Sequence, residues 1–443
     1  MECFFIKRKF IAIFLLIILV TTICQPVFAT DVRVESDSRT NKIYSILEII
    51  KNIIKEVVSQ LRSLLSGGDK PQETSSLETE FLKLENNKKN MVYSPLSIKY
   101  ALSMLNEGAN GNTKKQIEKV LGDKNLGKYN NIDKILSLAN SVYIREEFKE
   151  DIKESYKKQL EEKYNAEVNY DAFKNADNIN NWIENKTFGR IKDMLSDDIV
   201  QDSENMMVLI NALALDMEWE DNFDAEDTGG AEFFLEDGSS MNATTLKKET
   251  KSDSMSYYKD DEVTALRINL KEYENTQLEF VAVMPKEKLS NYIEEFNMDD
   301  LDNVIEKSKL ASETKAGLYV TVPRFSVEYD LNLKEDLIKL GITDAFNFEL
   351  ADFSNMSNKK IFVGDALHKA NIDFTEKGIK AAAATVIFIK DGMALKDDEP
   401  ERIIINKPFL YVIRDKETGE IWFTGTVYEP NSWEEDKANY EYR

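Results

Sequence analysis

The sequence predicts an α+β protein in which helices surround a large, mixed but mainly antiparallel central sheet. Apolar residues at helical spacing dominate the first part of the chain, for example at 98–105, 114–121 and 152–164. Runs of β-branched and aromatic residues follow later, at 207–215, 278–284, 317–322, 403–405, 409–413 and 421–427. Because the strands do not alternate strictly with helices, a parallel α/β architecture is excluded.

The N-terminus has the pattern of a secretory signal peptide. Lys7, Arg8 and Lys9 precede an apolar run over 10–20, and Val27-Phe28-Ala29 forms a small-residue cleavage site. The apolar run is short for a bilayer-spanning helix, which makes a retained membrane anchor the weaker alternative. We therefore expect residues 1–29 to be removed and the protein to be secreted into the extracellular space.

Cysteine content and charge exclude several classes of partner and site. Both cysteines, Cys3 and Cys24, lie in the signal peptide, so the mature chain has no disulfide and no cysteine-bound metal. The signal carries three cations and one anion, so its removal changes the formal net charge from −23 to −25. Such an acidic chain repels phosphate backbones, which excludes nucleic acid as a partner. A simpler role of the acidity is to keep an exported protein soluble.

Three further regions follow the signal peptide. Residues 30–76 form an extension in which apolar residues recur every three or four positions from 43 to 65, until Gly67 and Gly68 stop the pattern. This amphipathic helix either docks a partner or surface, or packs on the main domain, and the sequence does not choose between them. Residues 66–76 have linker composition. The main domain spans 77–430, and the acidic tail 431–443 is expected to be flexible.

The residues needed for catalysis are scarce. His368 is the only histidine, and the chain has no nucleophile elbow, zinc-binding helix motif or glycine-rich phosphate loop. A carboxylate calcium site stays open as an alternative. Because His368 lies in an apolar, strand-like stretch, we expect a hydrogen-bonded core residue rather than a catalytic base. The sequence thus predicts neither an enzyme nor a bound cofactor or metal.

The segment 376–389 combines conflicting local preferences. Glu376, Lys377 and Gly378 lead through Ile379 and Lys380 to four alanines and Thr385, and then to the strand-forming run Val386-Ile387-Phe388-Ile389. Alanine favours helix, whereas the run that follows favours strand. At a period of two, one face of the segment carries no charge: Ile379, Ala381, Ala383, Thr385, Ile387 and Ile389. The segment is therefore suited to enter a sheet, although an ordinary central strand has the same pattern.

This segment resembles the hinge of inhibitory serpins, and further blocks of that family occur in the family's order over nearly the whole main domain. The blocks include Tyr93-Ser94-Pro95-Leu96-Ser97-Ile98, Ile179-Asn180-Asn181-Trp182-Ile183 with Thr187-Phe188-Gly189-Arg190-Ile191, Asn211-Ala212-Leu213 with Trp219 and Phe223, Pro323-Arg324-Phe325, Gly341-Ile342-Thr343-Asp344-Ala345-Phe346, Ala351-Asp352-Phe353-Ser354, His368-Lys369-Ala370, and Asn406-Lys407-Pro408-Phe409. No single block is specific, but their ordered combination is. The resemblance implies the metastable serpin fold with a mobile, exposed reactive loop.

By this resemblance the protein is a monomeric suicide-substrate inhibitor of serine proteases. The protease forms an acyl-enzyme with the loop, and the cleaved loop then inserts into the central sheet. The implied hinge consists of Glu376, Gly378, Ile379, Ala381, Ala382, Ala383, Ala384 and Thr385. The polar cluster that lets the sheet open is expected to comprise Ser94, Ser97, Asn211 and His368, with Trp219 near the point where the loop first enters. Ile379 is bulkier than the family's usual residue, and Lys380 replaces the usual acid.

The cleaved bond is less well defined by the sequence. The family's spacing from Glu376 gives cleavage between Gly392 and Met393, with Ala394, Leu395 and Lys396 as alternatives because the loop is long. Recognition at Met393 or Leu395 suits a chymotrypsin- or subtilisin-like protease, and Lys396 suits a trypsin-like one. The acids at 397–399 disfavour trypsin-like enzymes, so Met393 and its neighbours are preferred. A non-inhibitory binding or chaperone protein with the same fold is the alternative function.

Overall fold

The computed structural model describes residues 77–122, 126–203, 205–379 and 399–437. Several expectations from the sequence therefore lie outside the described residues. These are the signal peptide, the helix over 43–65 with its linker, the hinge from Lys380 to Thr385, the candidate cleavage residues 392–396, and the tail beyond 437.

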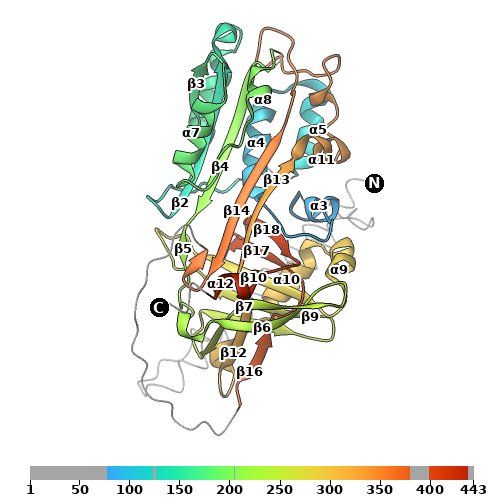
Figure 1. Ribbon diagram of the computed structural model, residues 1–443. Coiled ribbons are helices and arrows are strands. Elements are labelled where there is room, and N and C mark those ends of the chain that lie inside the picture. The colour runs from blue at the N-terminus through green and yellow to red at the C-terminus, as the bar shows by residue number, and fades with distance from the viewer. Residues whose placement is uncertain (1–76, 123–125, 204, 380–398, 438–443) are drawn as a thin grey trace, which may run out of the picture. The chain divides into compact units, whose positions relative to one another are not determined.

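The α+β architecture is confirmed. The helices cover the sheets from several sides (Figure 1). They are α3 (Leu77–Leu84), α4 (Pro95–Gly108), α5 (Gly111–Leu121), α6 (Glu154–Tyr164), α7 (Asp177–Lys186), α8 (Asp197–Gln201), α9 (Leu289–Glu295), α10 (Met298–Lys307), α11 (Leu333–Lys339) and α12 (Trp433–Asp436). The expected helix over 152–164 starts two residues later, because Ile152 is buried and forms an isolated β-bridge with Ser357.

Two sheets form the lower part of the view in Figure 1. One has the order β1-β18-β17-β10-β9-β8-β11 and the other β16-β12-β7-β6. Their strands are β1 (Met91–Tyr93), β6 (Gly229–Phe234), β7 (Ser240–Thr250), β8 (Met255–Lys259), β9 (Val263–Asn269), β10 (Leu278–Pro285), β11 (Lys309–Leu310), β12 (Leu318–Pro323), β16 (Glu401–Ile404), β17 (Phe409–Asp415) and β18 (Ile421–Val427). Within these two sheets only β12 and β16 pair in parallel.

The central sheet consists of two separately hydrogen-bonded pieces rather than one continuous sheet. One piece has the order β3-β2-β4, and the other β13-β14-β15-β5. Their strands are β2 (Leu136–Arg145), β3 (Glu167–Asp171), β4 (Met207–Leu215), β5 (Met217–Glu218), β13 (Phe325–Asn332), β14 (Leu367–Thr375) and β15 (Gly378–Ile379). β4 and β5 are separated only by Asp216, so the chain itself joins the two pieces at one end.

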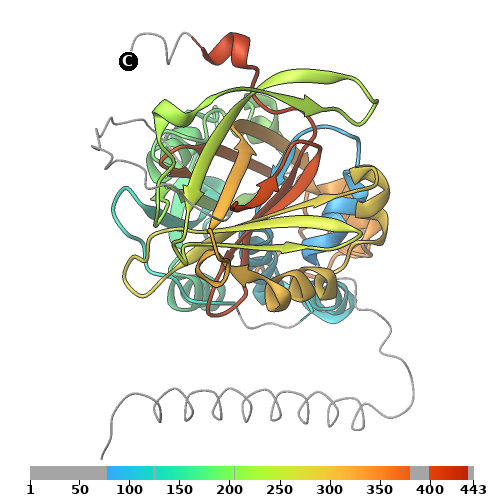
Figure 2. The same cartoon turned by 90° about the horizontal axis from the view of Figure 1, so that it is seen from below.

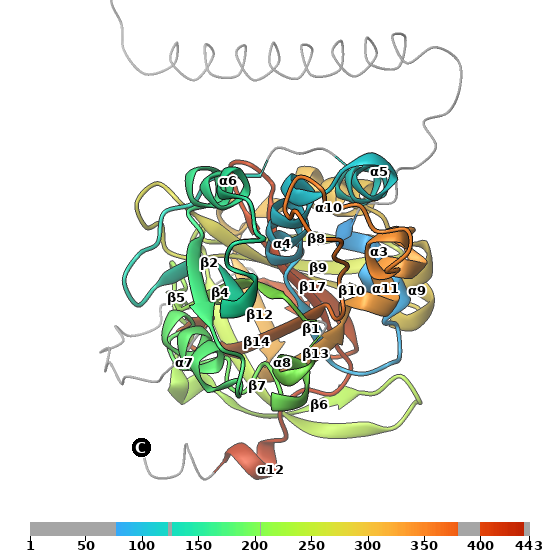
Figure 3. The same cartoon turned by 90° about the horizontal axis from the view of Figure 1, so that it is seen from above.

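α4 packs between the central sheet and the sheet that contains β18. Ser94 caps its N-terminus by accepting a hydrogen bond from the Ser97 backbone N–H, and Pro95 occupies the first turn, where no N–H donor is needed. The helix contacts β4 on one side and β18 on the other. Viewed from above, α7 lies on the opposite face of β2 and β4 from α4 (Figure 3). The central sheet is thus covered on both faces near β4.

The described part of the C-terminal tail is folded, which differs from the flexibility expected from its composition. α12 packs against β6 and β7, as the red helix in Figure 2 shows. The Asn431 carbonyl accepts a hydrogen bond from the Thr244 backbone N–H over 2.9 Å. The Thr244 hydroxyl donates to the Asp436 carboxylate, also over 2.9 Å. These contacts to one threonine anchor a segment whose acidic composition alone gave no sign of order.

Candidate functional site

The opening between β4 and β14 is the main irregularity of the central sheet. The two strands run side by side in Figure 1, yet neither pairs with the other among the described residues. A cavity of about 160 Å³ lies where β4 and β14 begin, at the end of the opening away from β15 and β5. Apolar side chains line much of it, among them Ile98, Leu105, Leu209, Leu337 and Leu367. The fold therefore leaves a largely apolar opening between two strands that are not hydrogen-bonded to each other.

A buried polar network on α4 links the two unpaired strands. The Ser94 backbone N–H donates to Nε2 of His368 on β14 over 3.0 Å. On the other side of the opening, the Ser97 hydroxyl donates to the side-chain oxygen of Asn211 on β4. The amide of Asn211 in turn donates to Asn140 on β2 over 2.7 Å. Residues from α4 thus hold β14 and β4 in place where no backbone ladder does so.

The sequence-predicted polar cluster comes together in this network. Ser94, Ser97, Asn211 and His368 are all members, and Ser94 and His368 are both buried. Sequence reasoning missed Asn140, which extends the network by donating to the Tyr164 carbonyl over 2.8 Å. Only its position directly opposite Asn211 in the antiparallel pairing of β2 and β4 identifies it. That register is a property of the sheet and has no local sequence signal.

His368 is neutral at physiological pH. Burial lowers the pKa of its imidazole from 6.5 to about 4, because the charged form loses its hydration. With Nε2 accepting a hydrogen bond from the Ser94 backbone, the ring acts as an acceptor toward α4. A proton on Nε2 removes this hydrogen bond, so protonation and an intact network exclude one another.

The first residues of the predicted hinge already lie within the sheet. Gly378 and Ile379 form β15, which pairs with β14 through Thr375 and Phe374 and with β5 through Glu218 and Met217. Ile379 is buried, on the face that period-two alternation assigns to the core. β15 is therefore a two-residue strand seated between β14 and β5, directly before the opening between β14 and β4.

Gly378 is required by the geometry of this short strand. Its φ of +153° lies in a region that residues with a side chain rarely adopt. A Cβ at this position would lie 2.1 Å from the Met217 carbonyl oxygen, and backbone atoms cannot move aside cheaply. The absence of a side chain lets the chain turn out of β14 and re-enter the sheet as β15.

Trp219 closes the end of the sheet where β15 enters. The ring is fully buried and lies 5.0 Å from the Phe374 ring, measured between centroids. Its indole N–H donates to the Thr375 carbonyl, and its backbone N–H donates to the Lys377 carbonyl, each over 2.8 Å. The Phe223 backbone N–H donates to the Glu376 carbonyl over 2.9 Å. Trp219 and Phe223 thus hold the residues between β14 and β15 in a fixed path.

Glu376 is held by its side chain as well. Its carboxylate accepts a hydrogen bond from the Thr228 hydroxyl over 3.1 Å, and the residue is only 9% exposed. The sequence-predicted hinge is therefore divided by the structure. Glu376, Gly378 and Ile379 are seated against described neighbours, whereas Ala381 to Thr385 lie outside the described residues.

An ion pair crosses the outer face of the opening. Arg190, in the segment after α7, donates to the Asp373 carboxylate of β14 over 2.8 Å, and the Arg190 side chain is 11% exposed. α7 itself packs against β2 and β4. The pair therefore links the layer above β4 to β14 across the gap. Arg190 belongs to a block recognised from sequence, but its partner lies 183 residues away and was not predicted.

The described part of the chain contains no group of three or more histidine, cysteine or acidic side chains arranged to hold a metal ion. None of the helices within 77–437 that the structure describes is long and apolar enough to cross a bilayer.

Comparison with known proteins identifies the family. The family model "Serpin (serine protease inhibitor)" matches residues 76–430. Mouse neuroserpin is 27% identical over 416 residues, covering 86% of this chain and 97% of neuroserpin. An uncharacterized serpin-like protein of Methanosarcina acetivorans is 29% identical over 375 residues, covering 80% of this chain and 85% of its own length. Relatives therefore come from an archaeon and a mammal alike.

Solved structures support the same assignment. The thermophilic serpin tengpin in its native state superposes with a TM-score of 0.67 at 27% identity, covering 82% of this chain and 95% of tengpin. Serpin48 of the insect Tenebrio molitor gives 0.67 at 25% identity, covering 82% and 100%. Human thyroxine-binding globulin, complexed with its ligand, shares the fold with a TM-score of 0.65 at 22% identity, covering 81% and 99%. From the family match, these likenesses and the seated hinge, we conclude that the chain belongs to the serpin family.

Proposed function

We propose that this protein inhibits serine proteases as a suicide substrate, by inserting its cleaved loop between β4 and β14. The observation that carries the proposal is β15, because a strand that starts there already pairs on both sides. Further antiparallel pairing in the same direction runs straight into the opening between β14 and β4. A chain end released by cleavage is free to continue along this path.

The register of β15 defines what each inserted residue meets. Ile379 lies opposite Phe374 of β14 and Met217 of β5. Counting six residues along each strand brings Thr385 opposite His368 and Asn211. In the inserted state, the Thr385 hydroxyl then faces the polar network between the two strands. Thr385 thus carries its hydroxyl to a part of the opening that has polar partners.

The same register matches the rest of the segment to the apolar cavity. Ile387 comes opposite Leu209, and Ile389 opposite Met207, both of which line the cavity of about 160 Å³. Filling it buries two β-branched side chains, each contributing about 1.5–3 kcal/mol. Backbone pairing on both sides adds to this gain. The unreacted protein is accordingly held by a kinetic barrier rather than by lowest free energy.

The chemistry up to the trapped state is that of an interrupted proteolysis. The hydroxyl oxygen of the protease serine attacks the loop carbonyl carbon, an ester forms, and the amine of the C-terminal fragment leaves with a proton. No water is consumed at this stage. Insertion then carries the esterified protease away from the loop's original position before hydrolysis. We propose Gly392–Met393 as the bond, with a chymotrypsin- or subtilisin-like enzyme as the target.

The decisive experiment is a protease panel with matched hinge variants. The purified protein is mixed with chymotrypsin, subtilisin, elastase and trypsin, and detergent-resistant complexes are sought on denaturing gels. Mass spectrometry of the released C-terminal peptide identifies the bond. Thr385→Arg puts a charge on the face that enters the core, so it should be cleaved without forming a complex. Lys380→Glu changes a charge on the opposite face and should still form the complex.

If every protease in the panel cleaves the loop, no complex forms, and the cleaved protein is no more heat-stable than the intact one, the proposal is overturned. That result would favour a non-inhibitory binding role.

Secretion is a separate proposal, based on residues 1–29. N-terminal sequencing of protein recovered from culture medium tests it. A first residue of Thr30 supports export with cleavage after Ala29, and full retention in the cell contradicts it.

A further inference from the structure

A second, polar cavity lies on the other side of α4. It has a volume of about 430 Å³ and lies between α4, α5 and α6, helices that neighbour one another in Figure 3. None of its lining residues also lines the apolar cavity beside β4. Its volume falls within the range of about 300–1,000 Å³ that is usual for small-molecule sites. This cavity is therefore separate from the path proposed for the reactive loop.

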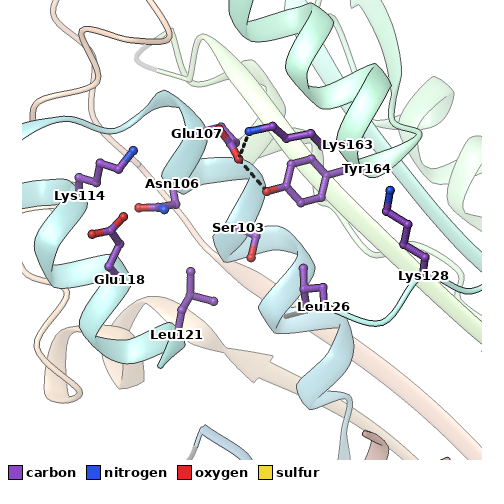
Figure 4. Close-up of a pocket in the computed structure, with 10 residues that line it drawn as sticks. All are labelled: Ser103, Asn106, Glu107, Lys114, Glu118, Leu121, Leu126, Lys128, Lys163 and Tyr164. Atoms are coloured by element: carbon purple, nitrogen blue, oxygen red, sulfur yellow. Dashed lines mark hydrogen bonds and ion pairs between the residues drawn. The ribbon is translucent and has the colours of Figure 1, made fainter. Parts of the chain in front are cut away.

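One wall of the cavity is electrostatically satisfied. Glu107 of α4 accepts hydrogen bonds from Lys163 over 2.8 Å and from the Tyr164 hydroxyl over 3.1 Å, as the dashed lines in Figure 4 show. Glu118 of α5 also has an interaction of its own. The acidic side chains that line the cavity are thus already engaged and do not need a cation from solution.

Two lysines at the cavity have no such partner. Lys114 of α5 and Lys128, in the segment before β2, make no ion pair with any described residue. Figure 4 shows them on opposite sides of the cavity, with Asn106 and Ser103 of α4 between them. Unpaired ammonium groups on two sides of a polar cavity favour an anion, and they disfavour both cations and uncharged apolar molecules.

Asn106 supplies a second, independent indication of a ligand. Its side chain points from α4 toward α5 and is only 8% exposed, and its amide oxygen has no hydrogen-bond partner. A buried polar atom left unpaired carries a free-energy cost, so native proteins rarely leave one without a role. Because the terminal torsion of asparagine is broad, either amide atom can turn toward a bound molecule.

We propose that this cavity binds a small hydroxylated organic anion. Lys114 and Lys128 would hold its anionic groups, while Asn106 and the Ser103 hydroxyl would pair with its hydroxyl groups. Leu121 and Leu126 give the cavity an apolar edge that suits the carbon skeleton. Hydroxycarboxylates and sugar phosphates share this chemistry. The proposal does not depend on protease inhibition, because the site is complete in the unreacted protein.

Isothermal titration calorimetry of the unreacted full-length protein tests the site with four probes: citrate, glucose 6-phosphate, glucose and inorganic phosphate. At least one organic anion should bind, with glucose and inorganic phosphate binding at least tenfold more weakly. Failure of both organic anions to bind overturns the proposal. Equally tight binding of inorganic phosphate also overturns it, because it indicates a site for simple ions.

Matched variants locate the binding site. Lys114→Gln and Lys128→Gln should each weaken binding about fivefold, as expected for a partly exposed ion pair. Lys115→Gln and Lys119→Gln remove exposed lysines of the same helix that do not line the cavity, and they should leave affinity unchanged. Asn106→Leu should weaken binding at least as much as either lysine variant, with circular dichroism confirming the fold. If all four lysine variants weaken binding equally, the effect is general electrostatics and the site is refuted.

Discussion

Ser94, at the N-terminus of α4, is hydrogen-bonded to His368 of β14. The Ser94 backbone N–H donates to the imidazole Nε2 over 3.0 Å. The two residues are 274 positions apart in the sequence. Ser94 caps α4, and His368 lies near the start of β14, so this bond fixes the supporting helix to one side of the opening. Ser97 makes the corresponding bond to Asn211 on the other side. The N-terminal end of α4 is therefore hydrogen-bonded to both strands that border the opening.

His368→Ala should increase spontaneous loop insertion and polymerisation. The substitution leaves the buried Ser94 N–H without an acceptor, which costs about 1–3 kcal/mol. Polymers formed during mild heating are measured on native gels. Asn371→Ala is the matched control on the same strand, because the amide oxygen that it removes has no partner. Equal polymerisation of the two variants would contradict a specific role for His368.

Acidification should destabilise the native state through the same histidine. Its folded pKa of about 4 lies below the unfolded value of 6.5, so the unfolded chain binds the proton more tightly. Stability is thus unaffected above pH 6.5, falls as the pH drops toward 4, and is lowered by about 3 kcal/mol in total. Thermal unfolding between pH 7 and 5 measures this slope, in a range where most carboxylates stay ionised.

His368→Gln is the control for that pH dependence, because glutamine has no proton to gain in this range. His368 is the only histidine, so the slope between pH 7 and 5 should nearly disappear in this variant. An unchanged slope would assign the effect to other groups and refute the prediction.

Under the proposed mechanism, Gly378→Ala should make the protein behave more as a substrate of the protease than as its inhibitor. The added Cβ would lie 2.1 Å from the Met217 carbonyl oxygen, so β15 cannot stay seated and insertion starts later. More loops are then cleaved and released before the protease is trapped. The measurement is the number of inhibitor molecules consumed per inhibited protease, which should rise severalfold. Gly229→Ala is the control, since its nearest contact would be a lysine amine at 3.7 Å. If the Gly378→Ala protein inhibits as well as the original protein, the backbone accommodates the added Cβ and the prediction is wrong.

Arg190→Gln should make the opening between β4 and β14 easier to enter. The substitution removes the ion pair with Asp373 that crosses the gap, while it keeps a polar side chain of similar length. The rate of spontaneous loss of inhibitory activity at 37–50 °C should rise, with a smaller change in the unfolding temperature. Lys192→Gln, which breaks an exposed ion pair with Glu184 nearby, provides the comparison. Equal rates in both variants would refute the role of the crossing pair.

Much of the fold was accessible from the sequence because its signals are local. The expected strands over 207–215 and 421–427 coincide with β4 and β18, since both segments are largely apolar and include β-branched or aromatic residues. The stop of α5 at Leu121 also follows from a local feature, the glycine at 122. The tail was expected to be flexible, whereas its described part is folded. Acidic composition does not reveal that Thr244 binds both Asn431 and Asp436.

The sequence by itself determined the α+β class, the polar cluster around His368 and the small, uncharged face of the hinge, because residue type and spacing carry these features. Only the tertiary structure decided that β4 and β14 stay unpaired and that Arg190 reaches Asp373. It alone decided that the amide oxygen of Asn106 lacks a partner, in the cavity that Lys114 and Lys128 line. These features depend on distances between segments far apart in the chain. Such distances are set by how helices and sheets pack together, and no local pattern encodes them.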